Sequence, residues 1–84
     1  MAVVIFAYFA SARAAASGVT SESFEADTID AARVLAEARH GAELARIFGI
    51  CSFLLNGAKV SAEVFASPLS GDVRVDVLPP FAGG

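Results

Sequence analysis

The chain has 84 residues, which is enough for one domain with a small hydrophobic core. A composition of 56% hydrophobic and 18% charged residues argues against an intrinsically disordered chain. The formal net charge is −3 and the basic residues are scattered, so we expect no nucleic-acid partner. One cysteine, Cys51, and one histidine, His40, are too few for an internal disulfide or a Cys/His metal site.

The first apolar run, residues 3–9, is rich in β-branched and aromatic side chains. Such a run is typical of a strand that is covered on both faces at the centre of a sheet. A signal peptide is the alternative, because Ala10-Ser11-Ala12 resembles a cleavage site. No Lys or Arg precedes the run, and the run is far too short to span a membrane. We therefore favour a buried strand and expect a cytoplasmic protein with no membrane partner.

The remaining expected elements follow in chain order: a short helical turn at 11–17, an edge strand at 19–25, a helix at 29–40, a short helix at 42–48, two strands flanking Asn56-Gly57, a turn at 68–71 and a last strand at 72–77. Thr28 is a good N-cap for the main helix, and Gly41 is suited to end it. Asn-Gly between two apolar segments is the strongest short-range signal for a β-hairpin.

The last strand alternates strictly between valines and charged residues. We expect Val73, Val75 and Val77 to face a core, and Asp72, Arg74 and Asp76 to face water. The order strand, strand, helix, strand, strand, strand predicts an α+β fold, with one sheet and its main helix packed on one face.

The chain ends with LPPFAGG. Pro79 and Pro80 lack backbone donors and are expected to end the last strand. Gly83 and Gly84 have no side chains to bury, and ordering glycine costs more backbone entropy than ordering any other residue. The tail therefore adds little to a core, and we expect it to be functional.

The tail resembles the C-terminus of the molybdopterin-synthase small subunits, a family of ubiquitin-like sulfur carriers. The resemblance rests on a Gly-Asp turn, a valine-rich strand, then Leu-Pro-Pro, a hydrophobic residue, a small residue and Gly-Gly at 71–84. The segment YFASAR at 8–13 is also similar to the first strand of that family and the residues after it. Leu-Pro-Pro before Gly-Gly is the most specific part of the pattern.

The resemblance implies a β-grasp, ubiquitin-like mixed sheet with one main helix, formed by residues 1–78, and a flexible tail over 79–84. It implies that an E1-like enzyme adenylates the Gly84 carboxylate with ATP, and that a sulfur donor protein then converts it to a thiocarboxylate. The sulfur would pass to a pterin precursor in the large subunit of molybdopterin synthase, during molybdenum cofactor biosynthesis. The chain itself would bind no cofactor or metal and would have no active site of its own. The implied partner-binding residues are Arg13, Leu78, Pro79, Pro80, Phe81, Ala82 and Gly83.

The physical properties of the tail suit insertion into a channel. Gly83 and Gly84 fit where side chains do not, and the two prolines restrict the root of the tail to extended conformations, which lowers the ordering cost. Phe81 is a candidate anchor at the channel mouth, although folding back onto the sheet is an equal alternative.

Other functions remain open at this stage. A carrier for thiamine or cysteine biosynthesis would use the same chemistry, a ubiquitin-like modifier would be conjugated to lysines through Gly84, and a plain binding domain would not use its tail at all. We expect Cys51 to be a small buried hydrophobe and His40 to complement a helix dipole. The expected partner surface is the sheet face opposite the main helix, together with the tail.

Overall fold

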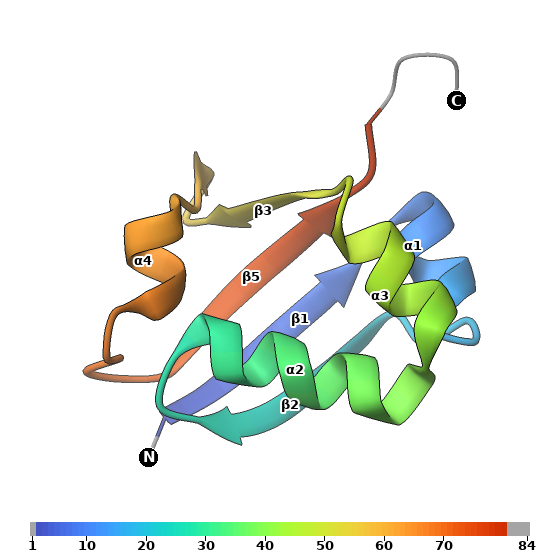
Figure 1. Ribbon diagram of the computed structural model, residues 1–84. Coiled ribbons are helices and arrows are strands. Elements are labelled where there is room, and N and C mark those ends of the chain that lie inside the picture. Colours follow the sequence, from blue (N-terminus) through green and yellow to red (C-terminus); the bar gives the residue numbers. More distant parts are fainter. Residues whose placement is uncertain (1, 81–84) are drawn as a thin grey trace.

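The computed structural model describes residues 2–80, which form one mixed sheet with helices (Figure 1). In chain order the elements are β1 (Ala2–Tyr8), α1 (Ala10–Ala15), β2 (Ser21–Ala26), α2 (Ile29–His40), α3 (Ala42–Phe48), β3 (Ser52–Leu55), β4 (Ala58–Lys59), α4 (Ala62–Ala66) and β5 (Val73–Leu78). The predicted order of strands and of the two main helices is confirmed.

The sheet has the strand order β2-β1-β5-β3-β4. The first and last strands, β1 and β5, pair in parallel, whereas the three other pairs are antiparallel. The last strand therefore lies at the centre of the sheet, and β2 lies at one edge. This arrangement confirms the α+β class, the central first strand and the predicted edge strand.

The core is organised around Phe6 of β1, whose side chain is fully buried. The centroid of its ring lies 5.9 to 6.2 Å from the ring centroids of Tyr8, Phe24, Phe48 and Phe53. Those rings come from β1, β2, α3 and β3, so one side chain joins three strands to a helix. Aromatic pairs at such distances each contribute about 0.5–1.5 kcal/mol beyond the burial of their area.

Local sequence signals set the ends of α2 as predicted. Thr28 Oγ1 accepts a hydrogen bond of 3.0 Å from the Ala31 N–H, which satisfies one of the free amides of the first turn. Gly41 ends the helix with a φ of 88°, a conformation that side chains disfavour. Three residues on one helical face are buried against the sheet: Ile29, Ala32 and Ala36.

The predicted Asn-Gly hairpin is present between β3 and β4. Asn56 and Gly57 have φ angles of 52° and 81°, and positive φ at both central residues is what a type I′ turn requires. The turn places Leu55 opposite Ala58. The hairpin forms the edge of the sheet opposite β2.

The stretch between β4 and β5, expected to be irregular up to the turn at 68–71, contains the short helix α4 instead. Ser61 caps it, since Ser61 Oγ accepts a hydrogen bond of 3.2 Å from the Val64 N–H. Phe65 packs edge-on against Phe53, with the ring centroids 5.1 Å apart. Five residues are too few for helical periodicity to be visible in a sequence, and this contact with β3 stabilises the turn.

The expectation that the first strand is covered on both faces is wrong. Val4, Phe6 and Tyr8 are fully buried on the face that carries the helices. Val3 and Ile5, which point to the opposite face, are only half-buried. A continuous apolar run therefore marks the central strand correctly, but one of its faces is partly open.

We predict that Phe6→Leu lowers the free energy of unfolding by about 1–2 kcal/mol, because leucine fills most of the volume but removes four aromatic contacts. Urea unfolding followed by circular dichroism measures the change. The matched control is Val34→Ala at an exposed position of α2, which is expected to stay within about 0.5 kcal/mol of the parent. Equal effects of the two substitutions would contradict the central role of Phe6.

Candidate functional site

The predicted site begins where β5 ends. Strand β5 pairs with β1 on one side and with β3 on the other, so its path is held over its whole length. Val75 and Val77 are fully buried beneath the helices. After Leu78 the chain continues through Pro79, which is buried, and Pro80, which is exposed. The remaining predicted site residues, at 81–84, lie outside the described part of the chain.

Arg13 lies close to the root of the tail. Its Nε donates a hydrogen bond of 3.2 Å to the carbonyl of Tyr8, the last residue of β1. The next residue, Phe9, donates its N–H to the carbonyl of Val77 at 3.2 Å. The structure thus brings Arg13 to the end of the sheet at which β5 ends at Leu78 and the prolines begin.

Helix α1 begins at a residue with an uncommon backbone conformation. Ala10 has a φ of 50°, which is uncommon for a residue with a side chain and turns the chain sharply after β1. Ala12 and Ala16 are fully buried, so only small side chains lie between α1 and the core. This tight packing holds Arg13 beside the ends of β1 and β5.

The sheet face opposite the helices combines apolar and charged side chains. In register, Ile5 lies beside Arg74, and Asp76 lies between Ala7 and Leu54. Leu54 also pairs with Lys59 of β4. We call this surface the open face. It is defined by the residues of β1, β3, β4 and β5 that point away from the helices: Val3, Ile5, Ala7, Ser52, Leu54, Lys59, Arg74, Asp76 and Leu78. The charges of β5 thus lie between apolar residues of β1 and β3, and surfaces that combine apolar and charged side chains in this way can bind other proteins.

A cluster of polar side chains around Glu22 was missed by the sequence analysis. Glu22 Oε2 accepts a hydrogen bond of 2.6 Å from the Tyr8 hydroxyl and lies 2.7 Å from His40 Nε2. Arg39 Nη1 lies 3.3 Å from Glu22 Oε1. The His40 side chain is 8% exposed and its ring packs edge-on against Tyr8. His40 therefore joins the end of α2 to β2, and the cluster needs no catalytic explanation.

The pKa values of Tyr8 and Cys51 are both raised, so both side chains stay neutral near pH 7. Burial, followed by the hydrogen bond to Glu22 and the charge of Glu22, raises the pKa of Tyr8 well above its usual value. Burial raises the pKa of Cys51 to about 11. Cys51 packs half-buried against the core, less buried than expected, and its thiol stays protonated at neutral pH.

Two further features are absent from residues 2–80. No group of three or more His, Cys, Asp or Glu side chains in this part of the chain could hold a metal ion. None of its helices is long and apolar enough to cross a membrane.

We predict that Tyr8→Phe lowers the free energy of unfolding by about 1–2 kcal/mol near neutral pH, since a hydrogen bond to a carboxylate is lost. In the parent protein the Tyr8 pKa is higher in the folded state than in the unfolded state. The parent therefore loses stability as the pH rises above about 10, where only the unfolded chain ionises Tyr8.

The phenylalanine variant lacks this loss, so the stability difference between the two proteins should shrink at high pH. Urea unfolding at pH 8 and at pH 10.5 tests this, and groups that titrate in both proteins cancel in the comparison. A difference that stays constant or grows with pH would contradict the assignment.

Comparison with known proteins yields matches only at the level of structure. No protein-family model matches the chain, and no curated protein matches it by sequence. The solution structure of small archaeal modifier protein 1 from Methanosarcina acetivorans matches with a TM-score of 0.81 and 23% identity, over 100% of this chain and 98% of that one.

Two further matches are subunits of molybdopterin-converting factors. A putative subunit 1 from Pyrococcus furiosus has a TM-score of 0.71 and 23% identity, over 95% of this chain and 99% of that one. A complex of subunits 1 and 2 from Helicobacter pylori includes a chain with a TM-score of 0.68 and 20% identity, over 98% and 99% of the respective chains. The chain thus has the β-grasp fold of ubiquitin-like proteins, which is the fold that the resemblance of its tail implied.

Proposed function

We propose that this protein is the sulfur-carrying small subunit of a molybdopterin synthase and that Gly84 is its working terminus. The observation that carries the proposal is the position of β5, which lies between β1 and β3, ends at Leu78 and is followed directly by Pro79 and Pro80. A tail that leaves a rigid central strand enters a partner with little ordering cost at its root. The sequence Phe-Ala-Gly-Gly then provides a narrow end for a channel.

The chemistry proposed for the tail starts from a poor electrophile, because the terminal carboxylate is ionised at neutral pH. In the first step a carboxylate oxygen of Gly84 bonds to the α-phosphorus of ATP, and pyrophosphate leaves. A sulfur donor at the oxidation level of hydrosulfide then displaces AMP and leaves a thiocarboxylate. An E1-like enzyme supplies the site for the first step, and a separate donor protein supplies the sulfur.

The proposed partner surface consists of the open face and Arg13. Leu54 and Leu78 offer partly exposed apolar area, while Arg74, Asp76 and Lys59 offer charges for orientation. Arg13 has its Nε bound to the Tyr8 carbonyl, which fixes the guanidinium near the root of the tail. The partner would be the large subunit of molybdopterin synthase, and the complex of subunits 1 and 2 from Helicobacter pylori supports a partner of this kind.

A ubiquitin-like modifier is the second candidate, because the solved structures that match include small archaeal modifier proteins. Both functions begin with adenylation of Gly84. They differ in the group that finally bonds to the carbonyl carbon of Gly84. This group is sulfur in the first case and a lysine amine of another protein in the second.

We predict that incubation with an E1-like enzyme, ATP and a sulfur donor replaces one oxygen of Gly84 by sulfur. Intact-mass spectrometry with fragmentation detects and places the change. One residue added after Gly84 should abolish it without unfolding the domain, because the core is complete at β5. The matched control carries the same residue at the N-terminus and should react normally. Conjugates of higher mass, together with an unchanged carboxylate at Gly84, would favour the modifier. The absence of both products would refute both functions.

We predict that Leu54→Lys weakens binding to the large subunit at least about tenfold, because it replaces apolar area on the open face by a charge. The substituted side chain would lie beside Asp76 on the sheet, so the fold should be retained. Isothermal titration calorimetry measures the affinity. Val34→Lys, on the exposed side of α2, is the control and should bind as the parent does. Unchanged affinity of the Leu54 variant would exclude the open face as the interface.

A further inference from the structure

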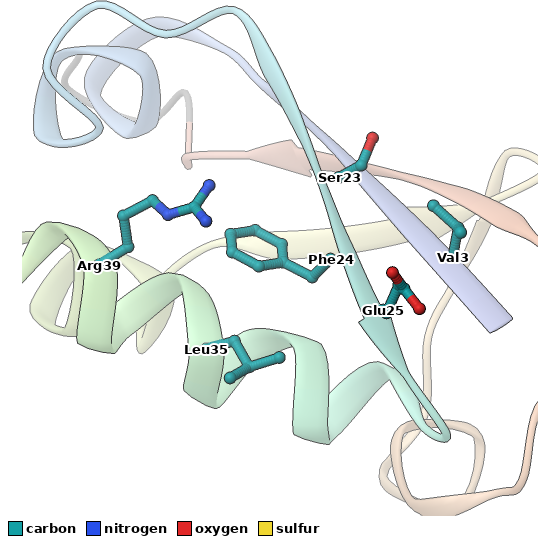
Figure 2. A pocket seen from close by; sticks show the side chains of 6 residues that line it. All are labelled: Val3, Ser23, Phe24, Glu25, Leu35 and Arg39. Carbon is teal, nitrogen blue, oxygen red and sulfur yellow. The ribbon is translucent and has the colours of Figure 1, made fainter. Parts of the chain in front are cut away.

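Two cavities of about 430 Å³ each flank helix α2. The first is a groove beside β2, and Figure 2 shows Leu35 and Arg39 of α2 on the same side of that strand as the Phe24 ring. Arg39, the cation in its lining, contacts the Glu22 carboxylate, and its guanidinium carbon lies 4.8 Å from the centroid of the Phe24 ring. The charge of this groove is therefore already engaged within the protein.

The second cavity lies on the other side of α2, between that helix and α4. We call it the α2–α4 cavity; its lining includes Asp30, Arg33, Phe48, Cys51, Phe53 and Phe65. The end of α3 and the start of β3 close it on the remaining sides. Its volume lies in the range of small-molecule sites, which is roughly 300–1,000 Å³. Strand β5 contributes no residue to its lining, so this cavity is separate from the root of the tail.

Three phenylalanine rings form the apolar wall of the α2–α4 cavity. The Phe53 ring packs edge-on against the rings of Phe48 and Phe65, with centroid distances of 5.2 and 5.1 Å. Phe48 and Phe53 are each only 4% exposed, so the core fixes both rings. Phe65 is partly exposed and belongs to α4, which has no buried residue. A ligand would therefore meet mainly the Phe65 ring, which Phe53 supports from behind.

Two carboxylates and one guanidinium lie beside this aromatic wall. Arg33 Nε and Nη2 both donate to Asp30 Oδ1, at 3.1 and 2.5 Å, and Arg33 Nη1 lies 3.7 Å from Glu37 Oε2. One positive charge thus faces two negative charges, which leaves one negative charge in excess. The guanidinium carbon also lies 5.9 Å from the centroid of the Phe65 ring, so the Asp30 carboxylate is close to the aromatic wall.

One oxygen of Asp30 is available to a ligand. Both hydrogen bonds from Arg33 go to Oδ1, and Oδ2 accepts none from residues 2–80. The Asp30 side chain is 47% exposed, so a ligand can reach this oxygen without displacing another residue. A free carboxylate oxygen next to an aromatic ring suits a donor that is cationic and joined to an apolar group.

We propose that the α2–α4 cavity binds a small organic amine that carries an aromatic ring. The ring packs on Phe65, where an edge-on or offset contact between rings is favourable. The ammonium group donates to Asp30 Oδ2, while Arg33 keeps its hydrogen bonds to Oδ1. The excess negative charge beside the cavity and the formal net charge of −3 of the chain both favour a cation. This site goes beyond the proposed sulfur transfer and does not depend on it.

An aromatic acid or a neutral aromatic compound fits the cavity less well than an amine. A carboxylate would meet the like charges of Asp30 and Glu37, and Arg33 is already shared between those two residues. A neutral compound gains the contact with Phe65 but leaves Asp30 Oδ2 unused. The expected order of affinity is therefore amine, neutral compound and acid.

The experiment is a titration of the full-length ¹⁵N-labelled protein with tryptamine at pH 7 and low salt. We expect a dissociation constant of about 1 mM for so small a probe, and the largest amide shifts at Arg33, Cys51, Phe65 and Ala66. Nuclear Overhauser contacts should join the indole protons to the methyl groups of Ala62 and Ala66.

Two analogues of tryptamine test the role of charge. The neutral 3-methylindole should bind about threefold more weakly, and the anionic indole-3-propionate at least about tenfold more weakly. Added salt should narrow the difference between the amine and the acid, because it screens the exposed carboxylates.

Substitutions separate the aromatic and the charged part of the site. Phe65→Ala should weaken tryptamine binding about tenfold, whereas Val64→Ala, on the same helix but outside the lining, should leave it unchanged. Asp30→Asn should remove the preference for tryptamine over 3-methylindole. Its matched control is Glu43→Gln, which removes the carboxylate of another i,i+3 pair with an arginine, outside the cavity, and should keep the preference. The ¹⁵N spectrum without ligand shows whether each variant is folded.

Three results would overturn the proposal. The first is the absence of shifts at concentrations about tenfold above the expected dissociation constant. The second is a set of shifts centred on the groove beside β2 or on the open face. The third is equal affinity for tryptamine and indole-3-propionate. If Phe65→Ala fails to fold, Asp30→Asn and its control still decide the question, and thiocarboxylate formation at Gly84 succeeds or fails independently of these results.

Discussion

The parallel pairing of β1 with β5 is the constraint on which the rest of the structure depends. It joins the first and last strands of the described chain at the centre of the sheet, with Phe6 opposite Val75 and Tyr8 opposite Val77. All four side chains are fully buried beneath the helices. Because both strands point the same way, they end at the same side of the molecule. The start of α1 and the root of the tail therefore lie next to each other (Figure 1).

This central pair also separates the surfaces of the molecule. On one face the aromatic rings of the core meet α2 and α3, and that face is closed. The opposite face keeps Ile5, Leu54 and Leu78 partly exposed among charged residues. The edge of β2, which pairs only with β1, forms a third surface, and the groove beside β2 adjoins it. The helix-covered face of the sheet thus forms the core, and two surfaces, the open face and the edge of β2, remain accessible to other molecules.

The roles of Tyr8 and His40 become apparent only from their tertiary contacts with Glu22. Considered along the sequence, His40 is only the last residue of a helix and Tyr8 only part of an apolar run. In the structure both meet the Glu22 carboxylate, so a buried hydroxyl and a buried imidazole find a polar partner. The raised pKa of Tyr8 follows from its burial and from that carboxylate. The cluster ties β2 and the end of α2 to the central strand.

The sequence by itself determined the elements whose signals are local. The Thr28 cap, the positive φ at Gly41 and the Asn56-Gly57 turn depend on neighbouring residues only, and they were predicted at the right positions. The resemblance of the tail likewise comes from consecutive residues, and the fold that it implied is present. Only the tertiary structure decided the strand order, the half-open face of β1, the α4 turn against Phe53, the position of Arg13 and the two cavities that flank α2. Each of these depends on contacts between residues far apart in the chain, and neither periodicity nor spacing encodes which strands become neighbours.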